Sequence, residues 1–209
     1  MNVLTAKKIK DILNKINADS KTRELYSSKL SRMINFLRNN TSFKTAAVKE
    51  GGSRGKQTET IKSDMDIIFC TSKDQNKNTI KNELLEKAKI GFNKVAKVHS
   101  GSEAVHVDFI KPKCNIDLVY LTNQQFQQES KKIKKIAKMR PLHKNAIKLA
   151  KFALNKAKID DIKGYEIELA CLHLNDNNLS DCVFNLINYF SGRIKKKGTS
   201  VDKVLKFIK

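Results

Sequence analysis

The sequence predicts an α+β fold: a small mixed β-sheet with accompanying helices, followed by a helical lobe. Short β-branched and alternating runs, which are typical of strands, are confined to residues 46–121. Apolar residues at helical spacing precede these runs, interrupt them once and continue without strand patterns from residue 123 to the end. We therefore expect N-terminal helices and a sheet in residues 1–122, and a helical lobe in residues 123–209.

Residues 5–39 contain two helical patterns. The apolar stripe of the first follows the i, i+3, i+4, i+7 spacing in Ile9, Ile12, Leu13 and Ile16. Thr5 is predicted to cap this helix, and residues 18–20 are predicted to separate it from the second. The predicted strands are 46–48, 67–69, 94–100, 104–110 and 114–121. The later predicted helices are 78–94, 124–138, 142–158, 165–174, 179–190 and 200–208, and residues 193–197 are predicted to form a basic loop.

Composition favours a polyanionic partner. The chain has 42 Lys and Arg against 21 Asp and Glu, a formal net charge of +21. Such an excess is typical of nucleic-acid binding, and the lysines are spread along the chain, not gathered in one membrane anchor. With no apolar run of membrane-spanning length and no secretory signal, we expect a cytoplasmic protein, with the nucleus as an alternative. Four scattered cysteines without a Cys-X-X-Cys pair argue against zinc and against a disulfide framework.

One stretch, residues 50–70, combines a glycine turn with paired acids. Gly51-Gly52-Ser53 follows a short β-branched run, and Asp64-Met65-Asp66 opens the apolar run 67–69. Residues i and i+2 of a strand share a face, so the two carboxylates lie side by side, where they repel each other unless a cation intervenes. Either feature alone is most often a turn or a solvated strand end. Together, in this order, they predict Mg²⁺-assisted chemistry on a nucleoside triphosphate.

A further acid lies within the apolar strand 115–120. Asp117 there would need a partner or a metal if it were buried, and it can equally be interpreted as a turn residue at the strand end. Asp108, in the preceding predicted strand, is the rival candidate. The histidines have no ligand spacing and are interpreted as surface or packing residues: His99, His106, His143 and His173.

The order of these motifs resembles the DNA polymerase β-like nucleotidyltransferase superfamily. The pattern is closest to 2′-5′-oligoadenylate synthetases and cyclic GMP-AMP synthase-like enzymes, which run Gly-Gly-Ser, Lys-Gly-Thr, Ser-Asp-X-Asp, and it is also similar to archaeal-type CCA-adding enzymes. Gln57 stands where the second motif has glycine, and the spacer is about a residue shorter. The zinc insert of vertebrate-type cyclic GMP-AMP synthases is absent from the sequence, so no zinc is expected.

The resemblance implies a nucleotidyltransferase palm plus a C-terminal helical lobe, and it implies roles for individual residues. Asp64, Asp66 and Asp117 would be catalytic and would hold Mg²⁺, with Mn²⁺ as the alternative ion. Gly52 and Ser53 would bind the triphosphate. In the helical lobe, Lys151 and Tyr165 would contact the donor nucleotide, with Lys148 as the alternate lysine.

The implied activity is template-independent transfer of a nucleotidyl group from ATP or another NTP to a hydroxyl, with pyrophosphate released. The leading hypothesis is an oligoadenylate or cyclic-dinucleotide synthase stimulated by double-stranded RNA. The alternatives are an RNA 3′-terminal transferase and a non-catalytic RNA-binding protein. We expect RNA on the basic face of the N-terminal helices, through Lys10, Lys15, Lys29 and Arg32, and along 131–138. For any single residue, a solvated face is the simpler interpretation.

Overall fold

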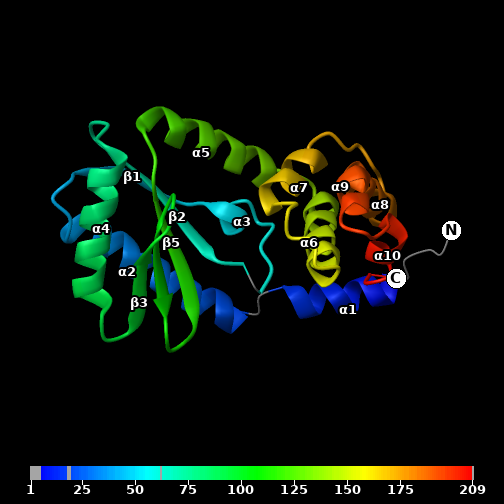
Figure 1. The fold of residues 1–209 in the computed structure, drawn as a ribbon, viewed down its shortest axis with the longest axis horizontal. Coiled ribbons are helices and arrows are strands. Elements are labelled where there is room, and N and C mark those ends of the chain that lie inside the picture. The colour runs from blue at the N-terminus through cyan, green and yellow to red at the C-terminus, as the bar shows by residue number, and fades with distance from the viewer. Residues whose placement is uncertain (1–5, 18–19, 62, 209) are drawn as a thin grey trace. The chain divides into compact units, whose positions relative to one another are not determined.

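A computed structural model describes residues 6–17, 20–61 and 63–208 (Figure 1). The predictions for Thr5 and for residues 18 and 19 lie outside these residues. The described residues form two compact units. We call residues 20–56 and 63–135 the palm unit and residues 6–17, 57–61 and 136–208 the helical unit. Across these described ranges, no helix combines the length and the apolar character needed to span a membrane.

The palm unit contains a five-stranded sheet in the order β1-β2-β5-β4-β3. Its strands are β1 (Thr45–Glu50), β2 (Met65–Thr71), β3 (Ala96–Ser100), β4 (Val105–Phe109) and β5 (Cys114–Tyr120). β2 and β5 are parallel, and the other neighbouring pairs are antiparallel. The expected α+β fold with a small mixed sheet is confirmed.

The two faces of this sheet differ because apolar and polar residues alternate along its strands. Buried residues alternate with less buried ones through β4 and β5, the period expected when one face is covered. α2 (Ser20–Asn39) and α4 (Lys77–Phe92) pack on the apolar face (Figure 1). Their fully buried contributions include Met33, Leu37 and Ile80. The opposite face therefore carries the polar side chains of β2, β4 and β5.

A short helix and a longer one complete the palm unit. α3 (Gly52–Gly55) follows β1 directly, and α5 (Asn123–Ala137) follows β5. The expected boundary at residue 122 differs from the observed division in three places. Most of α5 belongs to the palm unit, whereas α1 (Ala6–Ile16) and residues 57–61 belong to the helical unit. For α1 the reason is packing, because Ile12 and Ile16 are buried in the core of the helical unit.

The helical unit is built around α6 (Pro141–Lys156), which packs against α1, α7 (Gly164–Cys171), α8 (Leu179–Tyr189) and α10 (Val201–Leu205). α9 (Ser191–Lys196) packs against α8 and α10. Pro141 occupies the first turn of α6, where its missing N–H breaks no helical hydrogen bond. Residues 146–150 of α6 are almost entirely buried, so this helix contributes to the core all round its circumference. The expected helical lobe is present, with α1 added to it.

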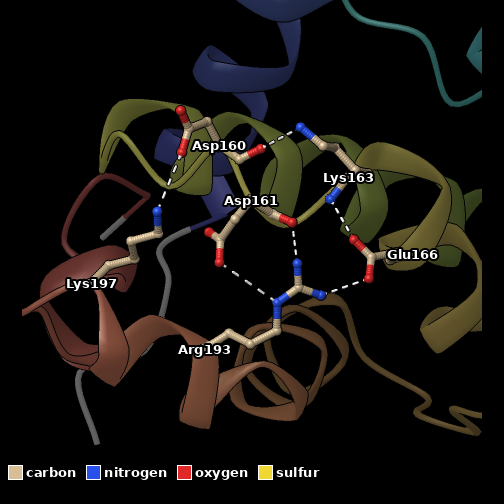
Figure 2. Close-up of polar contacts among 6 residues, drawn as sticks. All are labelled: Asp160, Asp161, Lys163, Glu166, Arg193 and Lys197. Carbon is tan, nitrogen blue, oxygen red and sulfur yellow. Dashed lines mark hydrogen bonds and ion pairs between the residues drawn. The ribbon is translucent and has the colours of Figure 1, made fainter.

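The prediction of a basic loop at residues 193–197 is wrong, because residues 191–196 form α9. Ile194 is fully buried and anchors this helix. Arg193 donates to Glu166 Oε1 at 2.6 Å and to the carbonyl of Asp161 (Figure 2). The hydrogen bond from Arg193 lowers the pKa of Glu166 below its usual range. This basic segment can form a helix because Arg193 is bound by Glu166 on α7 and by Asp161 in the loop before it.

Candidate active site

Three carboxylates lie on the polar face of the sheet in the palm unit. Asp66 of β2 and Asp117 of β5 are Cα partners in the parallel strand pair, so both side chains emerge on the same side. Asp64 lies two residues before Asp66 and directly precedes β2. The sequence placed Asp64 and Asp66 together by spacing alone, and the strand pairing adds Asp117 beside them.

The electrostatics of this group favour a bound cation. Asn115 Nδ2 donates to Asp64 Oδ1 at 3.2 Å. Burial raises the pKa of Asp64 above its ordinary value, and the negative charges of Asp117 and Asp108 raise it further, while the Asn115 hydrogen bond opposes the rise. The charged form of Asp64 is therefore disfavoured mainly by burial and further by two nearby carboxylates, a condition that a divalent cation relieves.

The glycine turn lies directly against one of these carboxylates. Gly51 N–H donates to the carbonyl of Asp66 at 2.8 Å, which ties the turn to β2. Gly52 has φ +53°, in the left-handed region that favours glycine, and a Cβ added to it would lie 1.6 Å from Asp66 Oδ2. The carboxylate thus occupies the space that any side chain at position 52 would need. Ser53 is the next residue of α3, so both predicted phosphate-binding residues lie at this turn.

A hollow of about 380 Å³ adjoins Asp66 within the palm unit. Gly52, Lys56 and Asp66 line one side of it, and α5 lines another with Gln125, Gln128, Glu129 and Lys132. Lys56 is buried, with Nζ 3.4 Å from Glu129 Oε1. The hollow therefore offers two lysines, both close to the Glu129 carboxylate, and two amides next to Asp66, a mixture suited to a phosphorylated ligand with a polar base.

The donor types fit Mg²⁺, although the carboxylates do not surround a common point. Among residues 6–17, 20–61 and 63–208, no three His, Cys, Asp or Glu side chains are close enough to hold an ion together. Mg²⁺ needs only one or two protein carboxylates, because water and substrate phosphates complete its shell. Asp64 and Asp66, with Asp117 beside them, meet that requirement in chemistry and in place.

Asp108, the rival to Asp117, lies on the same face but one strand further away. Its Cα partner is Asn115 of β5, and its carboxylate Oδ2 lies 3.5 Å from His99 Nδ1. The register of β2 and β5 therefore favours Asp117 as the neighbour of Asp66.

A histidine that the sequence did not single out contacts Asp117. His106 of β4 is the Cα partner of Asp117, and its Nδ1 lies 2.6 Å from Asp117 Oδ1. The alternation along 105–109 already placed His106 on the face of Asp108. The pairing of β4 with β5 in register could not be derived from that pattern, so the sequence did not predict this hydrogen bond.

The residues predicted to bind the donor nucleotide belong to the helical unit. Lys151 Nζ lies 2.7 Å from Glu168 Oε1, which is buried, and also donates to Thr58 Oγ1 at 3.3 Å. Lys148 is buried, and its Nζ donates to Asn17 Oδ1 at 3.0 Å. Tyr165, in the first turn of α7, is 58% exposed and so presents its ring to solvent. Both lysines have defined partners in the protein, and Tyr165 is the more accessible group.

Gln57, which replaces the glycine of the resembling motif, keeps a glycine-like backbone. Its φ is +61°, in the left-handed region that side chains rarely adopt. Lys144 Nζ donates to Gln57 Oε1 at 2.6 Å and so holds the side chain. The conformation of the loop thus explains why a glycine suits this position, and a hydrogen bond from α6 supports the glutamine.

The four predicted RNA-binding residues divide between the two units. Lys10 and Lys15 are exposed on α1 of the helical unit. On α2 of the palm unit, Lys29 Nζ lies 4.1 Å from the centre of the Phe109 ring, and the Arg32 guanidinium lies 5.3 Å from that of Phe92. Lys29 and Arg32 therefore also pack on aromatic rings, so a change there would alter packing as well as charge.

No protein-family model matches the chain, and no curated protein matches it. Solved structures do. CdnG, a CD-NTase of Bradyrhizobium diazoefficiens in complex with GTP, has a TM-score of 0.73 at 9% identity, over 93% of this chain and 79% of that one. CdnC of E. coli MS115-1 with ATP has a TM-score of 0.68 at 16% identity, over 89% and 71%. The Cid1 poly(U) polymerase has a TM-score of 0.69 at 11% identity, over 88% and 72%.

The chain has the nucleotidyltransferase fold. The expected combination of a palm and a helical lobe is confirmed by these similarities. In this nucleotidyltransferase fold, the sheet face that carries Asp64, Asp66 and Asp117 is the face against which the glycine turn packs. At identities of 9–16%, these similarities show the fold alone. Activity must therefore be inferred from the residues of the site.

Proposed function

We propose that the protein is a template-independent nucleotidyltransferase that uses ATP or another NTP and Mg²⁺. One observation carries the proposal: Asp66 is paired in register with Asp117 and lies against the Cα of Gly52. A carboxylate pair would be costly on this face without a cation, and a bulkier residue than glycine could not approach it. Both features serve a metal-bound phosphate better than they serve packing.

Each residue of the site has a defined task in this proposal. Asp64 and Asp66 would hold Mg²⁺ together with substrate phosphates, and Asp117 would hold Mg²⁺ on the side of the attacking hydroxyl; the metal would neutralise phosphate charge and activate that hydroxyl. The Gly52–Ser53 turn presents backbone to the triphosphate at close range, since Gly52 has no Cβ in the way. Lys56 and Lys132, in the adjoining hollow, provide positive charge for phosphate oxygens.

The acceptor hydroxyl distinguishes two candidate reactions. A synthase would join two nucleotides through a 2′ or 3′ hydroxyl into a short or cyclic product, with double-stranded RNA as activator. A terminal transferase would extend an RNA 3′ end. The similar folds of CdnG bound to GTP and of the Cid1 poly(U) polymerase support both reactions. The net charge of +21 supports RNA as either activator or acceptor.

Incubation with labelled ATP and Mg²⁺, with and without duplex RNA, tests the proposal. A short soluble oligonucleotide identifies a synthase, and a lengthened RNA identifies a terminal transferase. Asp66→Asn should abolish either product, while Asp108→Asn, on the same face one strand away, should reduce it much less. Absence of any transfer by the wild type, with Mg²⁺ or Mn²⁺ and each NTP supplied, would leave a non-catalytic RNA-binding protein as the better explanation.

RNA binding is tested most cleanly on α1, because Lys10 and Lys15 are exposed there, whereas Lys29 and Arg32 also pack on rings. Lys10→Glu with Lys15→Glu should weaken duplex RNA binding across all sequences. It should also flatten the dependence of log affinity on log salt, by roughly 0.9 for each phosphate that is no longer neutralised, on a B-form DNA reference. An unchanged affinity and salt slope would mean that the lysines of α1 do not contact RNA, and would favour the terminal transferase.

A further inference from the structure

The imidazole of His106 is held in one position beside the Asp117 carboxylate. His106 and Asp117 are Cα partners in the antiparallel pair of β4 and β5, and Nδ1 lies 2.6 Å from Oδ1. A carboxylate only accepts hydrogen bonds, so the imidazole donates through Nδ1–H. The hydrogen bond therefore occupies one oxygen of Asp117 and leaves Oδ2 as the second oxygen that could ligate a cation.

Two further residues favour this position of the ring, one by leaving space for it and one by stacking on it. Gly101 lies in the turn before β4. Its N–H donates to the carbonyl of Ala104 at 2.8 Å and so closes this turn. A Cβ added to Gly101 would lie 2.2 Å from His106 Nε2, so the ring lies where a larger residue would place its side chain. The ring of His99, on β3, stacks on the ring of His106, with centroids 4.8 Å apart and planes 28° apart.

This arrangement is more than strand packing requires. β4 and β5 already pair by backbone hydrogen bonds, and their apolar residues are buried on the other face. A histidine in that register on the polar face could extend into solvent. Instead, its ring fills the space left by Gly101, stacks on a second aromatic ring and contacts the carboxylate that pairs in register with Asp66.

We propose that His106 is a positioning residue: it orients the Asp117 carboxylate for divalent-cation binding, while Gly101 leaves the space that its ring occupies and His99 stacks on it. The inference rests on the proposed metal-dependent function. Its physical basis is that a ligating carboxylate binds better when a second hydrogen bond has already set its orientation, because less freedom is then lost on binding. His106 does not need to touch the cation or the nucleotide.

The test uses Mn²⁺ as the probe ion and measures its affinity directly, by electron paramagnetic resonance of free Mn²⁺, alongside turnover. His106→Phe keeps the ring but removes Nδ1–H, and it should weaken Mn²⁺ binding by about 10–100-fold, the usual effect of removing such a partner. Gly101→Ala keeps the imidazole but displaces it, and it should lower affinity in the same direction. His106→Asn retains an N–H donor and should restore most of the loss.

His99→Phe is the matched control. It preserves a ring for stacking and removes only the interaction with Asp108, so Mn²⁺ affinity should stay within about threefold of wild type. In an Asp117→Asn background, His106→Phe should have no further effect on Mn²⁺ binding, because the residue acts only through that carboxylate.

Failure of this inference is distinguishable from failure of the proposed function. If wild type binds Mn²⁺ and Asp66→Asn abolishes binding, but folded His106→Phe and Gly101→Ala bind as tightly as wild type, His106 is only structural. If wild type and Asp66→Asn bind Mn²⁺ equally poorly, the proposed metal site itself is wrong. Should His106→Phe not fold, the pair Gly101→Ala and His106→Asn decides: equal, wild-type affinity in both overturns the inference.

Discussion

Replacing Gly52 with alanine isolates the close approach between the glycine turn and Asp66. The new Cβ would lie 1.6 Å from Asp66 Oδ2 and 2.6 Å from its Cγ, far inside van der Waals contact. The turn is tied to β2 by the Gly51 hydrogen bond, so the carboxylate is the group that must move. Rotation of the Asp66 side chain relieves the collision of the new Cβ with Oδ2 and Cγ, and it displaces the carboxylate oxygens from their present positions.

Two effects of this substitution can be given magnitudes. A left-handed backbone costs an alanine about 1–2 kcal/mol, and in a chain of this length each kcal/mol lowers the melting temperature by about 2–4 °C. Displacement of a catalytic group by about 1 Å costs roughly 100-fold in rate. Gly52→Ala should therefore remain folded, melt a few degrees lower and lose at least about 100-fold in kcat/KM.

Gly198→Ala is the matched control for this prediction. Gly198 has φ +70°, but an added Cβ would meet nothing within 4 Å. It carries the same backbone strain without the collision, so its melting temperature should fall similarly while turnover stays close to wild type. Single-turnover transfer and thermal unfolding of both variants provide the comparison. Activity of Gly52→Ala within about threefold of wild type would refute the assignment of Asp66 and the glycine turn to one site.

Three further predictions concern the raised pKa of Asp64, the buried pair of Glu168 with Lys151, and the left-handed backbone of Gln57. Burial raises the folded pKa of Asp64, so its contribution to stability is favourable only at low pH and is lost as pH rises through that raised pKa. Without metal, Asp64→Asn should therefore have a slightly higher melting temperature than wild type at neutral pH, and this difference should vanish in acid. Saturating Mg²⁺ should reverse the sign of the difference. A lower metal-free melting temperature of the variant at neutral pH would contradict this. Glu168→Gln removes the buried negative partner of Lys151 and should lower the free energy of unfolding by about 3–5 kcal/mol in urea titrations. Glu166→Gln, whose partner Arg193 is partly exposed, should cost less than about 1 kcal/mol, and equal losses would argue against a special role for the buried pair. Gln57→Gly relieves left-handed strain, so turnover should stay within about threefold; a tenfold loss would show that the hydrogen bond from Lys144 is needed.

The local pattern of residues was enough to predict most helices and strands and the pairing of Asp64 with Asp66. Alternation in 105–109 and 115–120, helical spacing elsewhere and Pro141 place the strands and helices within a few residues of where they lie. Asp64 and Asp66 are two residues apart, so their shared face follows from strand geometry alone. The basic run 193–197 misled because charge indicates exposure but says nothing of a buried Ile194 or of acidic partners on another helix.

The residue pattern alone did not decide which later acid joins Asp66: the family resemblance favoured Asp117, and the tertiary structure places it there. Asp108 and Asp117 both lie in alternating strands, and nothing in either strand states its neighbour or its register. Pairing of β2 with β5 in parallel, at Asp66 with Asp117, makes that choice, and pairing of β4 with β5 adds His106. Strand order depends on which apolar faces bury most surface together, a property of the whole chain. The sequence determined the chemical groups of this site, and the register of three strands determined which of them meet.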